Sequence, residues 1–183
     1  KDCIAQKDLK MDALNRYEII RSDTLYRFYA VVPPKKHKYR IEKNYYSFAE
    51  DSIIITRGAA AGRIMHGSYT LYYPDKNLME QGNFKYGLKN GEWKTWFPGG
   101  ELMQTIQWKD GIRTGKITEF DSKGNIIRSG HYKNEQFTGT VTEASGDGKP
   151  RQVRYEKGKL VEEEKKKEPT TNGHEENKKT SGQ

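Results

Sequence analysis

The sequence has few residues that could cross-link the chain or hold a metal ion. Its 183 residues include a single cysteine, Cys3, which excludes a disulfide within the chain. It has four histidines, and no two of them have the spacing of metal ligands on a helix. These histidines are His37, His66, His131 and His174. We therefore expect no metal site and no cofactor.

Two further absences argue against other classes of protein. No run of about 18 apolar residues is present, so no segment is expected to span a membrane as a helix. The glycine-containing segment 57–63 lacks the Lys-Ser/Thr ending of a phosphate-binding loop and is predicted to be a tight connection between strands. The carboxylates mostly occupy predicted turns or exposed strand positions. We therefore predict that the chain has no catalytic residues and is not an enzyme.

The residues that are abundant favour a β-sheet. Hydrophobic residues make up only 33% of the chain and charged residues 32%, but aromatic residues reach 11%, with 12 tyrosines. Aromatic side chains favour pleated sheets, and the 18 glycines supply conformations that tight turns require. The composition indicates strands that bury aromatic rings rather than a large aliphatic core.

A repeat of about 24 residues organises most of the chain. Its leading glycines are Gly67, Gly91, Gly115 and Gly139. Each unit contains a β-rich segment, a four-residue turn such as Pro74 to Asn77, and a return strand such as Leu78 to Phe84. The pattern predicts an all-β fold, an elongated single-layer antiparallel meander of repeated hairpins.

The turn length also predicts how the strands pair. Four-residue turns would place each leading glycine opposite an aromatic residue, pairing Gly67 with Phe84, Gly91 with Trp108 and Gly115 with Tyr132. A second aromatic row should then point to the other face. This row comprises Phe48, Tyr72, Trp96 and Phe120. Because a single-layer sheet cannot bury both faces by itself, we expect that the sheet is curved, that the N-terminal segment covers one face, or that a partner does.

The chain divides into four regions. Residues 1–16 form an N-terminal segment, and residues 17–66 are predicted to contain a hairpin around Ser22-Asp23 and a divergent repeat led by Lys43. Residues 67–160 hold the repeats. Residues 161–183 are charged, lack apolar anchors and are predicted to be a disordered tail.

Several motifs resemble a known family. The sequences Asn90-Gly91-Glu92-Trp93-Lys94, Phe97 to Leu102 and Trp108-Lys109-Asp110-Gly111 resemble the membrane occupation and recognition nexus (MORN) repeat in its bacterial variant, over residues 67–158. The third copy departs from the motif at Ile117 and Glu135. The resemblance implies an elongated ribbon without catalytic residues that serves as an interaction scaffold. Bacterial proteins of this kind are often labelled as antitoxins.

The leading functional hypothesis is a repeat module that binds a protein partner, since exposed Trp and Tyr dominate interface energetics. The candidate contact residues are Tyr69, Tyr72, Tyr73, Trp93, Trp96 and Trp108. The same rings could instead serve sheet packing, and toxin neutralisation is a further alternative.

Another alternative is an anionic partner, either nucleic acid or lipid headgroups. Lys85, Lys109 and Lys133 recur at one offset and should line one edge of the ribbon, on the face opposite their aromatic neighbours. A separate basic cluster follows Pro33-Pro34 and is predicted to be a solvated loop, or else a docking patch for an acidic partner. The cluster comprises Lys35, Lys36, His37, Lys38, Arg40 and Lys43.

The first residues of the chain contain a pattern that indicates where in the cell the protein resides. Cys3-Ile4-Ala5 before Gln6 has the small-x-small character of a signal-peptidase site. This pattern predicts a periplasmic, outer-membrane-associated or secreted protein, with a cytoplasmic protein as the alternative. Asp2 before Cys3 argues against a lipoprotein anchor.

Overall fold

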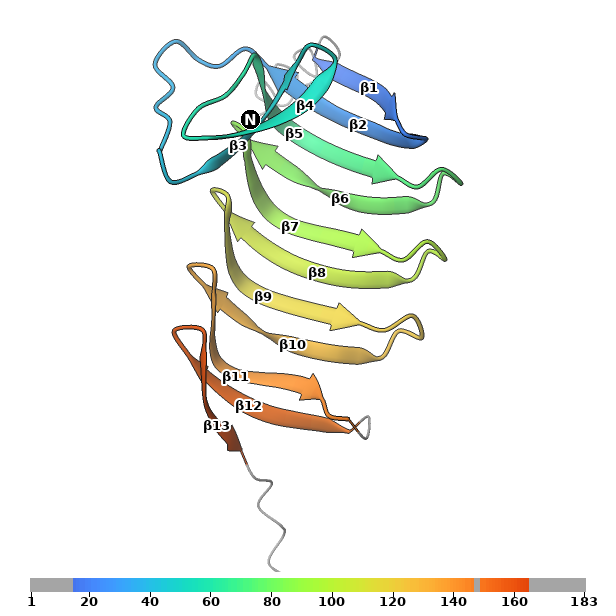
Figure 1. The fold of residues 1–183 in the computed structure, drawn as a ribbon, viewed down its shortest axis with the longest axis vertical. Helices are drawn as coiled ribbons and strands as arrows, with labels where there is room; N and C mark the ends of the chain where they lie inside the picture. Colours follow the sequence, from blue (N-terminus) through green and yellow to red (C-terminus); the bar gives the residue numbers. More distant parts are fainter. Residues whose placement is uncertain (1–14, 147–148, 165–183) are drawn as a thin grey trace, which may run out of the picture.

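The computed structural model describes residues 15–146 and 149–164, which form one open antiparallel β-sheet (Figure 1). The described residues contain no helix of the length and apolarity that a membrane span requires. The strands are β1 (Arg16–Arg21), β2 (Thr24–Val31), β3 (Asn44–Ala49), β4 (Ser52–Arg57), β5 (Arg63–Tyr72), β6 (Leu78–Lys85), β7 (Leu88–Trp96), β8 (Leu102–Lys109), β9 (Ile112–Phe120), β10 (Ile126–Lys133), β11 (Gln136–Ala144), β12 (Pro150–Glu156) and β13 (Lys159–Glu164).

The strands from β5 to β13 follow one another in sequence order along the long axis of the molecule (Figure 1). Each strand pairs antiparallel with the next. This arrangement confirms the predicted all-β meander of hairpins.

The predicted pairing of glycine with aromatic residues is also confirmed. Gly67 lies opposite Phe84, Gly91 opposite Trp108 and Gly115 opposite Tyr132. The turns that set this register are alike in successive repeats, because the amide of Tyr73 donates to the Asn77 carbonyl as that of Phe97 does to Glu101, each at 2.8 Å. The third hairpin has the equivalent bond, from the Asp121 amide to the Asn125 carbonyl at 2.9 Å, so a common turn geometry keeps all three hairpins in one register.

One position of this turn differs between repeats and gives a stability prediction. Lys76 has φ 70°, whereas glycine occupies the equivalent positions, Gly100 (φ 95°) and Gly124 (φ 81°). A residue with a Cβ is strained in this left-handed region. Lys76→Gly should therefore raise the free energy of unfolding by about 0.5 kcal/mol, and Gly100→Ala should lower it by about 1 kcal/mol. Urea denaturation of both variants tests the pair, and an opposite sign for either would contradict it.

Of the two N-terminal hairpins, the first begins the sheet, as the sequence predicted, and the second lies in an unexpected place. The predicted hairpin around Ser22-Asp23 is formed by β1 and β2, and β2 pairs directly with β5. The hairpin of β3 and β4, which was expected to be a divergent repeat in line with the others, lies off this path and pairs with β5 at only two positions. The prediction of an in-line repeat was wrong because β2 already occupies the edge of β5.

This displacement changes the place of Phe48. Its ring packs against Tyr17 and Phe28, with centroids 4.6 and 5.2 Å apart, next to the main core. Phe48 therefore does not extend the row of Tyr72 and Trp96, as expected from the repeat frame. It helps the N-terminal strands to cover the core face.

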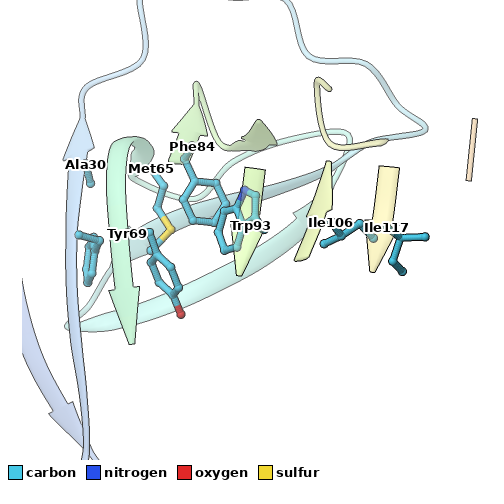
Figure 2. Packing of buried hydrophobic residues seen from close by; sticks show 8 residues of the cluster. Ala30, Met65, Tyr69, Phe84, Trp93, Ile106 and Ile117 are labelled. Atoms are coloured by element: carbon cyan, nitrogen blue, oxygen red, sulfur yellow. The ribbon is translucent and has the colours of Figure 1, made fainter. Parts of the chain in front are cut away.

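The core is a row of side chains that runs across the sheet (Figure 2). Tyr69, Trp93, Ile117 and Val141 occupy equivalent repeat positions and are all buried. Gly82 pairs with Tyr69 and leaves room for the indole of Trp93, which lies against its backbone. The Phe84 ring completes this packing at 5.0 Å from Trp93. Phe28, Ala30 and Met65 extend the core at its N-terminal end.

The C-terminal boundary lies later than predicted. Strand β13 pairs with β12 through Glu164, so residues 161–164 belong to the sheet and not to the tail. Strand pairing uses backbone groups and does not require the apolar anchors that this segment lacks. Residues 165–183, the rest of the predicted disordered tail, lie outside the described residues, as does the segment 1–14.

Candidate functional site

Two of the six predicted contact residues belong to the core. Trp93 is 1% exposed and Tyr69 is 7% exposed. Their rings lie 5.5 Å apart, and both contact Phe84. Burial raises the pKa of the Tyr69 hydroxyl, with a further contribution from the charge of Glu80. These two side chains stabilise the sheet and offer almost no surface to a partner.

Trp108 lies on the same face as the core row, beside a largely buried lysine. The Lys89 ammonium lies 3.8 Å from the Trp93 ring centroid and 5.5 Å from that of Trp108. It also forms an ion pair of 2.8 Å with Glu80, and both side chains are largely buried. Trp108 is thus one wall of an internal lysine site rather than a freely exposed ring.

The remaining three predicted residues lie together at the turn end of the hairpins. Tyr72 and Trp96 occupy equivalent positions on the face opposite the core row, paired with Leu78 and Leu102. Tyr73 follows Tyr72, and its hydroxyl donates a hydrogen bond of 2.9 Å to the Trp96 carbonyl, which ties one repeat to the next. These three side chains are partly exposed.

The same repeat positions add two residues that the prediction of contact residues omitted. Phe97 is equivalent to Tyr73, and Phe120 is equivalent to Tyr72 and pairs with Ile126. Both side chains are partly exposed. The 24-residue offset could have found them as contact residues, because it aligns Phe97 with Tyr73 directly. We name the set Tyr72, Tyr73, Trp96, Phe97 and Phe120 the aromatic strip.

The aromatic strip continues into exposed aliphatic residues. Ile126 is 55% exposed and pairs with Phe120 across the turn of the third hairpin. The next residue, Ile127, is 41% exposed. Each repeat advances two strands, or about 10 Å, so the strip from Tyr72 to Phe120 extends roughly 20 Å. Such a row of partly exposed apolar side chains is typical of a binding surface.

The strip carries little charge of its own. At its N-terminal end, the Arg27 guanidinium lies 5.1 Å from the Tyr72 ring centroid and is paired with Glu18 at 2.7 Å. This ion pair partly neutralises the arginine. The aromatic strip therefore offers apolar contacts more than electrostatic attraction.

The predicted row of lysines lies elsewhere. Lys85, Lys109 and Lys133 are exposed and are the last residues of β6, β8 and β10. They therefore line one edge of the ribbon, at the end of the hairpins opposite the aromatic strip. In residues 15–146 and 149–164 no group of three or more His, Cys, Asp or Glu side chains could hold a metal ion.

Comparison with known proteins agrees with this repeat structure. No curated protein matches the chain. The family model described as MORN repeat variant matches three tandem segments of the chain, residues 65–86, 89–110 and 113–134. These segments are the hairpins β5–β6, β7–β8 and β9–β10. The fourth predicted copy forms the hairpin of β11 and β12 and keeps the register, with Gly139 opposite Tyr155, but lies outside these matches.

Proposed function

We propose that the chain is a non-catalytic repeat scaffold that binds a protein partner through the aromatic strip. The observation that carries this proposal is the row of partly exposed rings at equivalent positions of three hairpins. Scaffold function is also typical of MORN repeats, which match these hairpins. Each ring contributes apolar area at a low cost in side-chain entropy, which favours aromatic residues as interface anchors.

The separation of the aromatic strip from the row of lysines favours a protein over nucleic acid or lipid headgroups. Binding of single-stranded nucleic acid combines stacked bases with nearby cations that contact phosphates. Here the strip and Lys85 lie at opposite ends of β6, which has eight residues and is about 24 Å long. One nucleotide cannot contact both.

Loss of two strip side chains should weaken partner binding without unfolding the protein. We expect Trp96→Ala/Phe120→Ala to weaken binding at least about tenfold, because buried aromatic anchors contribute roughly 2 kcal/mol each. The partner is first captured at high salt, and its affinity for purified variants is then measured by calorimetry. Circular dichroism checks that the fold is retained.

A matched control removes exposed apolar area elsewhere. Leu160 on β13 is 53% exposed and pairs with Tyr155, at the end of the hairpins away from the strip, so Leu160→Ala should leave the affinity unchanged. An equal loss of affinity in Leu160→Ala and the strip variant would remove the strip from the proposal. Capture at low salt of a nucleic acid that high salt releases, with no protein retained at high salt, would favour the anionic alternative.

Location and biological role extend the proposal. We place the scaffold in a bacterial cell envelope on the basis of Cys3-Ile4-Ala5, which lies outside the described residues. Neutralisation of a toxin would be one form of protein binding. Fractionation of the native cells tests the location, and recovery of the chain only in the cytoplasm would contradict it.

A further inference from the structure

A second surface lies at the other end of the hairpins, over the turns that follow β6 and β8. The segment 32–43 connects β2 to β3 and carries the basic cluster (Figure 1). It is the irregular loop expected from the sequence, but Lys43 is only 5% exposed, so the cluster is not solvated throughout. Beside it lies a cavity of about 510 Å³. Its walls include His37, Lys38, Arg40, Lys85, Tyr86 and Asp110.

The cations of this cavity lack partners. Among the residues that the structure describes, Lys38, Arg40 and Lys85 form no ion pair. By contrast, Lys89 pairs with Glu80 at 2.8 Å and Arg113 with Glu135 at 2.6 Å. Three positive charges on the wall are opposed by one carboxylate, that of Asp110. A concave surface with such an excess attracts anions.

Lys43 does not line the cavity but interacts with two of the charges on its wall. Burial lowers the pKa of its ammonium, and the neighbouring charge of Arg40 lowers the pKa further, whereas the carboxylates of Glu42, Asp110 and Glu135 act in the opposite direction. The opposing effects of Arg40 and Asp110 indicate that both charges act on the same ammonium. A bound anion would relieve the repulsion between Lys43 and Arg40.

The loop is held in place by several contacts, so the cavity is preformed. The amide of Arg40 donates to the Tyr45 hydroxyl at 3.0 Å, and that of Lys43 donates to the Arg40 carbonyl at 3.0 Å. The His37 ring lies 5.6 Å from Tyr86 and 4.6 Å from Tyr39. Since the backbone around Arg40 is already fixed, ligand binding would lose little conformational entropy in ordering it.

His37 has a buried polar atom without a partner. Its Nε2 forms no hydrogen bond within the described part of the chain. An unsatisfied buried polar atom costs about 1–3 kcal/mol. Because this atom is out of reach of solvent, it does not face the open cavity, and the unpaired cations of the wall are the groups that a ligand could reach.

We propose that this cavity binds a small molecule that carries a phosphate group. Phosphate accepts several hydrogen bonds at once and suits the planar fork of Arg40 together with the point charges of Lys38 and Lys85. The volume of about 510 Å³ exceeds what inorganic phosphate fills and is within the range of small-molecule sites.

Calorimetric titration of the intact chain with inorganic phosphate, a nucleoside monophosphate and a sugar phosphate tests the proposal. We expect at least one organic phosphate to bind more tightly than inorganic phosphate. Lys38→Gln/Arg40→Gln should weaken this binding at least tenfold. Asp110→Asn should tighten it several-fold, because the substitution removes the only opposing charge on the wall.

The loop itself provides a control of equal charge. Lys35 and Lys36 are exposed and do not line the cavity, so Lys35→Gln/Lys36→Gln should change the affinity less than twofold. An equal loss in both double variants would show a general charge effect and overturn the proposal. So would binding only to anionic vesicles or to single-stranded oligonucleotides, or no phosphate compound bound below about 1 mM. Circular dichroism of each variant shows that a loss does not reflect unfolding.

Discussion

Gly82→Ala should destabilise the protein by about 3 kcal/mol, although it adds only one methyl group. A Cβ at Gly82 would overlap the indole of Trp93, with Cγ only 2.6 Å away. Trp93 is 1% exposed and packed between Tyr69 and Phe84, so its ring cannot move aside. Thermal or urea denaturation followed by circular dichroism measures the loss.

Two other glycines provide graded controls. A Cβ at Gly146 would meet nothing within 4 Å, and Gly146→Ala should change the free energy of unfolding by less than about 0.5 kcal/mol. A Cβ at Gly130 would lie 2.9 Å from a methyl group of Val141, which can shift more easily than an indole, so Gly130→Ala should have an intermediate effect. A Gly82→Ala variant as stable as Gly146→Ala would contradict the packing of Trp93 on Gly82.

Trp93→Ala should have the largest effect of any single truncation, a loss of about 4 kcal/mol in the free energy of unfolding. Its indole contacts Tyr69, Phe84 and the Lys89 ammonium. Removal would leave a cavity in the middle of the core and expose the Lys89–Glu80 ion pair to water. Since the free energy of unfolding of a typical domain is about 5–15 kcal/mol, this substitution would remove much of the stability.

Trp96→Ala is the matched comparison, three residues further along the same strand. Because Trp96 is partly exposed, its truncation should cost less than half as much as that of Trp93. Denaturation of both variants under one condition gives the difference directly. Equal losses would mean that both indoles are core residues and that the aromatic strip is not free for a partner.

The repeats were predictable because local signals in them agree. The 24-residue period aligns glycines, turns and aromatic residues, and a four-residue turn leaves one register, so Gly91 opposite Trp108 followed from the sequence. The place of the β3–β4 hairpin, by contrast, did not follow from the sequence. Its Tyr45 fits the repeat frame, but competition between β2 and β4 for the edge of β5 depends on tertiary packing that no local pattern encodes.

The candidate site was predictable in part for a similar reason. An odd spacing indicates that Trp93 and Trp96 point to opposite faces of a strand. Which face is buried depends on cover by Phe28 and other N-terminal residues, and the repeat pattern contains no information about that cover. The sequence therefore identified the aromatic residues, but only the structure separates the core ring of Trp93 from the strip residue Trp96. The cavity of Lys38 and Lys85 likewise joins segments that are far apart in the chain.

Site-specific photocrosslinking in cells tests whether a partner binds through the aromatic strip. A photoreactive phenylalanine analogue replaces Phe97 in the strip or, as a control, the exposed Gln152 on β12, in cells that naturally produce the chain. We expect one protein adduct at position 97 that persists at high salt and is absent at position 152. Equal adducts at both positions, or adducts to nucleic acid or lipid alone, would contradict it.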